Sequence, residues 1–246
     1  MPPARDLYVH LAPEFVAPER FAGGVAVVLD VLRATTTMIH ALAAGCSSVR
    51  PCRTVEEARR LAAELPSPVL LAGERDGLPL SGFDFGNSPG DFTIDRCLGS
   101  TLVMTTTNGT RALLHAAAAE HVFVAGFVNL TAVSERIRRG ACPLHILCAG
   151  DAGGVALEDA LLAGAIVDRV AHEGTMLNDA ARLAWGCWRQ HAHDVAAALE
   201  AGAGGVRLHA LGYDEDIRAA ARVDAFDVVP ELMRDPLRVE SRWTGS

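Results

Sequence analysis

The sequence predicts an α/β fold of three layers, in which helices cover both faces of a mostly parallel or mixed central sheet. Two observations predict it. Short apolar runs alternate with segments of helical period along the first two-thirds of the chain, and such alternation is typical of parallel sheets covered by helices. Half of the 246 residues are hydrophobic and only 21% are charged, so the chain can bury a substantial core.

Six short apolar runs are the predicted strands of this sheet. They are bounded by glycine, proline or polar residues, which separates them from the helical segments. In chain order they are Val25–Leu29, Ser48–Cys52, Val69–Ala72, Thr101–Thr105, Val122–Ala125 and Leu144–Cys148.

The segments between these runs are predicted helices. Thr35–Ala44 is the first, and it is expected to end at Gly45 because glycine commonly terminates helices. Thr54 and Glu57 form a capping-box pattern at the start of the next helix. Further helices are predicted after Asn108, after Asn129 and from Val155 to about Arg222.

The whole chain, residues 1–246, is predicted to be one domain. The similar segments ALAAG (41–45) and ALLAG (160–164) would be explained by two related halves, about 1–125 and 126–235. A glycine at the end of two unrelated helices explains them equally simply.

Two segments show neither a helical nor a strand period. Residues 73–100 hold glycines, prolines and acidic residues, and a loop of this length inside a domain is usually functional. Phe83 and Phe85 are expected to attach this loop to the core. The final segment, 235–246, is predicted to be a loose extension.

The composition excludes several classes of function. The formal net charge is −8 without a basic stripe, so nucleic acid is a poor partner. No apolar stretch suits a membrane span or a signal peptide, and the six cysteines contain no C-x-x-C pair and are expected to be reduced. We therefore expect a soluble cytoplasmic protein that binds a small anionic molecule and neither nucleic acid nor membrane. The sequence leaves open whether it forms a homo-oligomer.

Polar clusters directly follow three of the predicted strands. The first contains Asp30, Arg33 and Thr35–Thr37; the others are TTTNGTR (105–111) and CAGDAGG (148–154). In open parallel sheets, ligands bind at the carboxyl ends of the strands, and the helix N-termini that follow attract anions. A single cluster is explained by helix capping. Three clusters that include two arginines favour a shared anion site.

Asp30 has three interpretations that the residues leave open. At the carboxyl edge of the sheet, its carboxylate would ligate Mg²⁺, attack phosphorus as a nucleophile, or cap the next helix. Mg²⁺ typically takes one or two carboxylates together with water and a substrate phosphate. The other candidate carboxylates are Glu74, Asp76, Asp84, Asp151 and the pair Glu158–Asp159.

Several sequence blocks together resemble the 2-phosphosulfolactate phosphatases. They are VVLDVLRATTT (27–37), GERDGLPLSGFDFGNSP (73–89), TTTNGTRAL (105–113), CAGDAGGVALEDALLAGAIVD (148–168) and RLHALGYDEDI (207–217). The resemblance implies a three-layer α/β/α fold and a Mg²⁺-dependent phosphatase. Its substrate would be (2R)-phospho-3-sulfolactate or a related 2-phospho-hydroxy acid, a step of coenzyme M biosynthesis in methanogens. Asp151 departs from the family pattern, in which threonine is expected.

The resemblance, with the charge of this substrate, implies a role for each candidate residue. Asp30 and Arg33 are the predicted catalytic residues; guanidinium groups suit oxyanions because they bind them in bidentate fashion. The predicted substrate-binding residues are Arg75, Asn87, Ser88, Thr106, Thr107, Asn108, Gly109, Thr110 and Arg111. The predicted metal ligands are Asp30 with Glu74, Asp84 or Glu158.

Two alternatives stay open at this point. The first concerns mechanism: either water attacks phosphorus directly, or Asp30 attacks first and forms a phospho-enzyme. The second concerns function: a non-catalytic module that binds a phosphorylated or sulfonated metabolite would keep the arginines and the threonine loops. Such a module would need neither Asp30 nor Mg²⁺.

Overall fold

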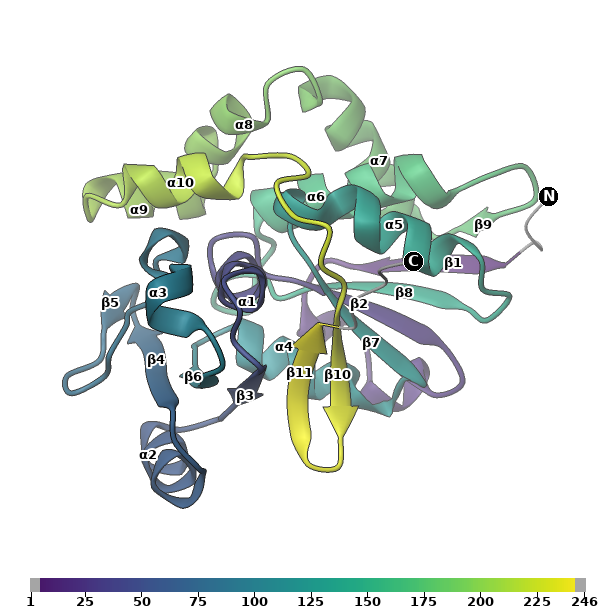
Figure 1. The fold of residues 1–246 in the computed structure, drawn as a ribbon. Coiled ribbons are helices and arrows are strands. Elements are labelled where there is room, and N and C mark those ends of the chain that lie inside the picture. Colours follow the sequence, from purple (N-terminus) through teal and green to yellow (C-terminus); the bar gives the residue numbers. More distant parts are fainter. Residues whose placement is uncertain (1–4, 242–246) are drawn as a thin grey trace.

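The computed structural model describes residues 5–241 of the chain. Within them, eleven strands form one sheet in the order β5–β4–β6–β3–β11–β10–β7–β2–β8–β1–β9. Helices lie on both sides of this sheet (Figure 1). The predicted α/β class, with three layers and a mixed sheet, is therefore confirmed.

The strands are β1 (Asp6–His10), β2 (Val25–Leu29), β3 (Ser48–Pro51), β4 (Val69–Arg75), β5 (Leu78–Pro79), β6 (Thr101–Thr105), β7 (His121–Ala125), β8 (Leu144–Cys148), β9 (Met176–Leu177), β10 (Pro230–Arg234) and β11 (Leu237–Ser241). The α-helices are α1 (Ala34–Ala43), α2 (Val55–Glu64), α3 (Ile94–Cys97), α4 (Gly109–His115), α5 (Leu130–Arg138), α6 (Leu157–Val170), α7 (Asp179–His191), α8 (Val195–Ala201), α9 (Ala203–Ala210) and α10 (Asp214–Ala220). Short 3₁₀-helices are η1 (Pro13–Phe15), η2 (Pro18–Phe21), η3 (Pro89–Asp91), η4 (Ala116–Ala118) and η5 (Phe127–Asn129).

Strand β2 shows how the sheet supports a core on each face. Val27 and Leu29 belong to the hydrophobic cluster formed with α5, α6 and α7, whereas Ala26 and Val28 belong to the cluster formed with α1 and α4. Alternate side chains of a strand point to opposite faces, and all four are fully buried. A strand covered on both faces is apolar at every position, which is why its sequence run is continuous.

The sheet consists of two groups of parallel strands joined by an antiparallel hairpin. Strands β1, β2, β7 and β8 form one group, and β3, β4 and β6 form the other. The hairpin β10–β11 lies between them and meets each group through one residue pair, Glu231 with Phe123 and Val239 with Val49 (Figure 1). Both groups draw strands from residues 1–125, so they are not the two halves suggested by the sequence, and that division stays a prediction.

The six predicted strands are confirmed to within a few residues, and so is the cap of α2. The Thr54 hydroxyl oxygen accepts a hydrogen bond from the Glu57 amide at 3.1 Å. The Glu57 carboxylate accepts in return from the amide of Arg53 at 2.8 Å, one residue earlier than a standard capping box.

The loose extension predicted for residues 235–246 is wrong for its described part. Residues Leu237–Ser241 form β11, which pairs with β10 along its whole length. Val239 is completely buried, because this strand lies in the middle of the sheet rather than at its edge. Residues 242–246 lie outside the described part of the chain. The strands β1, β5, β9 and β10 were not predicted from the sequence either.

The long segment 73–100 is more ordered than its sequence suggests. It begins inside β4, turns into the two-residue strand β5, and later contains η3 and α3. Its attachment to the core is confirmed: Phe85 is buried and stacks on Phe92 with 4.6 Å between ring centroids, and Phe83 packs on the cluster beneath α2.

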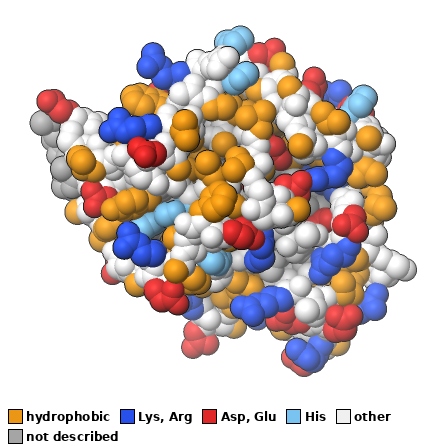
Figure 2. Space-filling view, turned by 180° about the vertical axis from the view of Figure 1, so that it is seen from behind, with side chains coloured by type: hydrophobic (Ala, Val, Ile, Leu, Met, Phe, Trp, Pro, Cys, Tyr) orange, Lys and Arg blue, Asp and Glu red, His pale blue; other side chains and the backbone are white. Residues whose placement is uncertain are grey.

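The surface agrees with the balance of charges in the sequence. Figure 2 shows acidic and basic side chains interspersed, with no broad basic area on that face. All six cysteines are free thiols. Among residues 5–241, no helix combines the length and the apolar character that crossing a membrane requires.

Candidate active site

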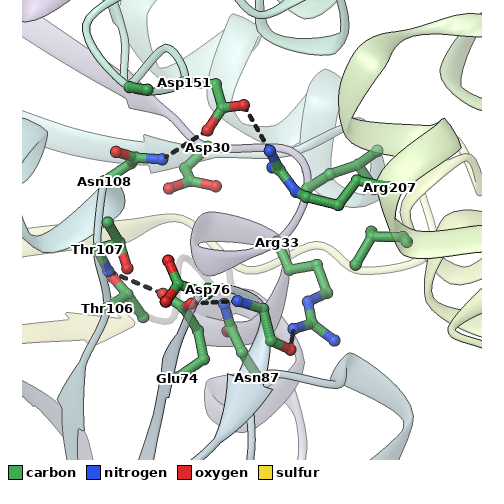
Figure 3. A pocket seen from close by; sticks show the side chains of 14 residues that line it. Asp30, Arg33, Glu74, Asp76, Asn87, Thr106, Thr107, Asn108, Asp151 and Arg207 are labelled. Atoms are coloured by element: carbon green, nitrogen blue, oxygen red, sulfur yellow. Dashed lines mark hydrogen bonds and ion pairs between the residues drawn. The ribbon is translucent and has the colours of Figure 1, made fainter. Parts of the chain in front are cut away.

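A cavity of about 280 Å³ opens where the carboxyl ends of β2, β4, β6 and β8 converge. All three polar clusters predicted from the sequence contribute to it (Figure 3). The lining residues are Asp30, Leu32, Arg33, Glu74, Asp76, Gly77, Asn87, Thr106, Thr107, Asn108, Asp151, Ala152, Arg207 and Leu208. The three clusters therefore meet at one cavity, and the hairpin after β4 and helix α9 complete its walls.

Asp30 caps a helix and also lines the cavity. It is the first residue after β2, and its Oδ1 atom accepts a hydrogen bond from the Ala34 amide at 3.1 Å. The Thr35 hydroxyl in turn accepts from the Asp30 amide at 3.0 Å, so this turn is fixed on both sides. Within the described residues, the Oδ2 atom of Asp30 has no hydrogen-bond partner, although the residue is only 8% exposed. The carboxylate therefore has one oxygen available to a ligand.

Burial strongly perturbs the charge of Asp30. Desolvation raises the pKa of its carboxyl to about 7; the hydrogen bond from Ala34 and the charge of Arg33 oppose this rise, while Glu74 and Glu158 add to it. Because several carboxylates share one buried region, each disfavours ionisation of the others. A cation bound among them would relieve this repulsion.

Glu158 and Asp159 begin α6 beside Asp30, and burial raises the pKa of both carboxyls. Asp159 is structural, since its two oxygens accept hydrogen bonds from the amides of Val31 at 2.8 Å and Gly150 at 3.1 Å. It therefore ties the loops after β2 and β8 to one helix. Glu158 has a buried Oε2 atom without a hydrogen-bond partner in the described structure, but it does not line the cavity.

Glu74 connects two walls of the cavity. It lies near the end of β4 and is 7% exposed. Its Oε1 atom accepts a hydrogen bond from the Thr107 amide at 2.8 Å, and its Oε2 atom accepts from the Gly77 amide at 2.9 Å (Figure 3). The carboxylate thus holds the threonine loop against the hairpin after β4.

Arg33 is a buried guanidinium held from three directions. Its Nη1 atom donates to the Asp216 carboxylate at 2.6 Å and to the Ser88 hydroxyl at 3.3 Å. Its Nη2 atom donates to the Gly77 carbonyl at 2.7 Å, and the Tyr213 ring lies 4.5 Å away, centroid to Cζ. Burial raises the pKa of Asp216, and the hydrogen bonds from Arg33 and Ser88 oppose that rise. Arg33 is therefore fixed in place, with N–H groups left over for an anion.

Arg207 and Asp151 form an ion pair at the cavity. The Arg207 Nη1 atom lies 2.6 Å from Asp151 Oδ2, and the Asn108 amide donates to Asp151 Oδ1 at 3.4 Å. Figure 3 shows Asp151 between these two side chains, next to Asp30. Asp151 is the residue that departs from the family pattern noted in the sequence. The ion pair shows that its extra carboxylate has a guanidinium partner.

Two lining residues have a backbone conformation that is uncommon for residues with a side chain. Asp76 has a φ of 55° and Ala152 a φ of 49°, both in the left-handed region. Such residues concentrate at functional sites. Their position here agrees with a functional role for the cavity.

The structure does not bring every predicted site residue to the cavity. Asp30, Arg33, Glu74, Asn87, Thr106, Thr107 and Asn108 line it, whereas Arg75, Asp84, Ser88, Gly109, Thr110, Arg111 and Glu158 do not. Asp84 lies outside the lining, and its Oδ2 atom accepts a hydrogen bond from the Leu71 amide at 2.8 Å in an exposed position. We therefore do not retain Asp84 as a candidate metal ligand.

Three of the remaining predicted residues, Arg75, Thr110 and Gly109, contact residues in or next to the lining. Arg75 donates to the Thr105 hydroxyl at 3.0 Å, and Thr110 lies 3.2 Å from Thr106, hydroxyl to hydroxyl. Gly109 permits close packing, because a Cβ atom there would lie 2.5 Å from the Ala34 Cβ and 2.8 Å from Asp30 Oδ2.

Sequence reasoning missed Arg207 and Asp216 as functional residues. Both lie in the block RLHALGYDEDI (207–217), which carried the resemblance without assigning any role to its members. Their charged side chains in that block were the only local signal. Their function depends on the packing of α9 and α10 over the cavity.

The donor set at the cavity suits Mg²⁺ only with help from other ligands. Within the described chain, no three His, Cys, Asp or Glu side chains are grouped closely enough to hold a metal. Mg²⁺, however, usually takes one or two carboxylates and fills its other positions with water and substrate phosphate. Asp30 fits that requirement, because it is buried and has an oxygen without a hydrogen-bond partner in the described structure.

Comparison with known proteins identifies the class to which this fold and cavity belong. The family model of 2-phosphosulpholactate phosphatase matches residues 10–235. A similar protein of Caldanaerobacter subterraneus is 37% identical over 217 residues, which cover 86% of this chain and 89% of that protein. One of Synechococcus sp. is 39% identical over 231 residues, 91% of this chain and 94% of that protein. One of Thermotoga maritima is 38% identical over 208 residues, 85% and 88% respectively.

Each of these relatives bears the name "Probable 2-phosphosulfolactate phosphatase". The chain is therefore an enzyme of the phosphoric monoester hydrolase class. It belongs to the 2-phosphosulfolactate phosphatase family, and the resemblance seen in its sequence blocks is confirmed.

Proposed function

We propose that this protein is a Mg²⁺-dependent phosphatase that hydrolyses (2R)-phospho-3-sulfolactate to sulfolactate and phosphate. The observation that carries the proposal is the buried carboxylate of Asp30: one of its oxygens has no hydrogen-bond partner among residues 5–241, and it lines a cavity that Arg33 also lines. The shared name of the relatives supports the choice of substrate. Because the family is one of phosphatases, we do not retain the alternative of a non-catalytic binding module.

The charge of the cavity supports a metal cofactor. Its lining holds the carboxylates of Asp30, Glu74, Asp76 and Asp151, opposed by the guanidiniums of Arg33 and Arg207. A substrate with phosphate, carboxylate and sulfonate groups would meet repulsion from the excess of carboxylates. A divalent cation at Asp30 neutralises this excess and gives the phosphate a partner of opposite charge.

The residues of the chain have distinct tasks in the proposed reaction. Asp30 would hold Mg²⁺, which neutralises charge on the phosphoryl oxygens when it is bound. Arg33, fixed by Asp216 and Tyr213, directs its remaining N–H groups to the phosphate without having to be ordered first. The hydroxyls of Thr106 and Thr107 would orient the substrate from the opposite wall.

The test is a phosphate-release assay with purified protein. We expect release from phosphosulfolactate with Mg²⁺, loss of release with EDTA, and recovery when Mg²⁺ is restored. Asp30→Asn should reduce turnover at least 10³-fold, on the scale of losses at essential catalytic groups, and Asp84→Asn, outside the cavity, is the matched control. Turnover that survives EDTA, or that survives Asp30→Asn, would contradict the proposed site.

Chemical trapping separates the two chemical routes. Attack by Asp30 forms an acyl phosphate, which mass spectrometry detects after an acid quench as a phosphoryl group added to Asp30, whereas direct attack by water leaves Asp30 unmodified. The cytoplasmic location and the link to coenzyme M biosynthesis stay predictions from the sequence.

A further inference from the structure

A second cavity of about 480 Å³ lies next to the first and shares two of its wall residues, Thr106 and Thr107. Pro18, Arg53, Thr110, Arg111, Leu114 and His115 complete its lining. We call it the Arg53 cavity. The threonine loop after β6 is therefore a wall of both cavities, and a molecule bound along this loop contacts residues that line each of them.

The two cavities have opposite charge. The lining of the Arg53 cavity contains two guanidiniums and one imidazole but no carboxylate, whereas four carboxylates line the Asp30 cavity. The threonine hydroxyls add hydrogen-bond donors to the basic cavity. Its chemistry suits a sulfonate or a carboxylate that does not take part in phosphoryl transfer.

Arg53 reaches this place because of strand pairing. β3 and β6 are parallel neighbours, and the ladder continues one residue beyond β3 through the bond from the Cys52 amide to the Met104 carbonyl at 2.8 Å. Arg53 therefore stands at the carboxyl edge of the sheet, beside the loop that holds Thr106. Its amide is bonded to Glu57, but its guanidinium has no hydrogen-bond or ion-pair partner among residues 5–241.

Arg111 and His115 complete the basic wall from one helix. They are four residues apart on α4 and share a face. The His115 ring is fixed by the contact of its Nε2 atom with the Val16 carbonyl at 2.8 Å. Arg111 pairs with Glu14, and both side chains are more than a third exposed. Exposed pairs of this kind contribute little stability, so the guanidinium can exchange Glu14 for an anion.

We propose that the Arg53 cavity binds the non-reacting acidic end of the substrate while the phosphate lies in the Asp30 cavity. This inference rests on the proposed function, which supplies a substrate with several anionic groups on three carbons. The different charges of the two cavities then determine where each anionic group binds. The phosphate lies with the cation at Asp30, and a sulfonate or carboxylate lies between Arg53 and Arg111. Arg53 is thereby a specificity-determining residue.

The test measures binding of sulfolactate, which cannot turn over, by calorimetry in the presence of Mg²⁺. We expect Arg53→Gln to raise the Kd for sulfolactate about tenfold, and Arg111→Gln to do the same. Arg60→Gln is the matched control, because Arg60 is an exposed arginine of α2 that lines neither cavity. Equal affinity of the wild type and Arg53→Gln would overturn the proposal, whether or not the protein proves to be a phosphatase.

Two truncated substrates identify the group that Arg53 receives. Phospholactate keeps the carboxylate and lacks the sulfonate, and the phosphate ester of 2-hydroxyethanesulfonate keeps the sulfonate and lacks the carboxylate. Arg53→Gln should raise KM about tenfold for the one that retains the bound group. A KM within twofold of wild type for both compounds would contradict the proposal, whereas a wild type that hydrolyses none of these esters would contradict the proposed function alone.

Discussion

The guanidinium of Arg207 and the carboxylate of Asp151 meet at the cavity with 2.6 Å between nitrogen and oxygen. They come from different parts of the chain, since Asp151 follows β8 and Arg207 lies on α9. The hydrogen bond to Asp151, and after it the charge of Asp151, raises the pKa of Arg207. The pair attaches the helical C-terminal part of the chain to the sheet beside the candidate catalytic residues.

This pairing predicts that a second substitution, at Asp151, reverses the effect on KM of a substitution at Arg207. Arg207→Gln leaves the Asp151 carboxylate unbalanced next to an anionic substrate, so KM should rise about tenfold, or about 1.4 kcal/mol. Adding Asp151→Asn removes the repulsive charge and should restore KM to within about threefold of wild type, because residues in contact are not additive. If the two losses simply add, Asp151 does not act on the substrate through its charge.

The buried Asp30 predicts a pH-dependent gain in stability for Asp30→Asn in metal-free protein. The folded-state pKa of Asp30 is raised to about 7 from an ordinary 3.8, so wild type is favoured with Asp30 neutral. The wild-type protein therefore has its full unfolding free energy below pH 4, where Asp30 is neutral in both states. Part of this free energy is lost as the pH rises from 4 to 7. The variant does not titrate at this position, and its advantage in unfolding free energy should grow over this interval to the order of 4 kcal/mol.

Urea unfolding in EDTA at several pH values checks this expectation. The difference between the variant and wild type should be small near pH 4 and constant above pH 7. A difference that is independent of pH would show that Asp30 is not forced towards its neutral form by burial.

The contact between α4 and the Asp30 turn predicts that Gly109→Ala is damaging. The new methyl group would lie 2.5 Å from the Ala34 Cβ and 2.8 Å from Asp30 Oδ2, so the helix must move. We expect a loss of about 1–3 kcal/mol in unfolding free energy, as for other overpacked sites, and a fall in activity. Gly90→Ala is the control, since a Cβ atom there meets no atom within 4 Å. Equal losses of unfolding free energy in both variants would contradict the explanation by overpacking.

The paired histidines of β1 and β8 predict a decline in stability in mild acid. His10 Nε2 lies 3.1 Å from His145 Nδ1, and burial, followed by the charges of His145, Arg20 and His115, lowers the pKa of His10 to about 4. The folded state favours the neutral form of His10. The full unfolding free energy is therefore present above pH 6.5, and part of it is lost as the pH falls from 6.5 to 4.

His10→Phe should flatten this decline, because phenylalanine keeps an aromatic ring against Phe21 but does not titrate. The measurement is the unfolding free energy at pH 7, 6 and 5. His193→Gln, at an exposed position, should leave the slope unchanged. If the unfolding free energy of the His10 variant falls with pH as steeply as that of the wild type, groups other than His10 cause the acid sensitivity.

The parts of the fold that sequence reasoning found are those specified by short-range patterns. Val25–Leu29 is apolar throughout, as a strand buried on both faces must be, and Thr54 caps its own helix. The strand Leu237–Ser241 was missed although charged Arg238 and Glu240 alternate with its apolar residues, because two apolar positions in five residues are too short a pattern to separate a strand from a loop. Its place in the centre of the sheet follows from pairing with β10 and β3, and the β3 contact is with a segment distant in the sequence.

The same limit applies to the candidate site. Asp30 could be found because it directly follows a strand, where the topology alone places it at the ligand-binding edge. Arg207 could not, because an arginine on a glycine-rich helix has no local feature that separates it from other surface arginines. Asp84 shows the converse: its acidic loop suggested a ligand, but the carboxylate is used to hold the Leu71 amide.

The hairpin β10–β11 has a consequence for synthesis of the protein. Strands β3 and β7 leave the ribosome long before the hairpin that lies between them in the sheet. Until it arrives, each has an edge with unpaired amides and carbonyls, and such edges invite pairing with other chains. We expect ribosome-bound chains that end before Pro230 to depend on chaperones, and release from chaperones to coincide with insertion of the last strand.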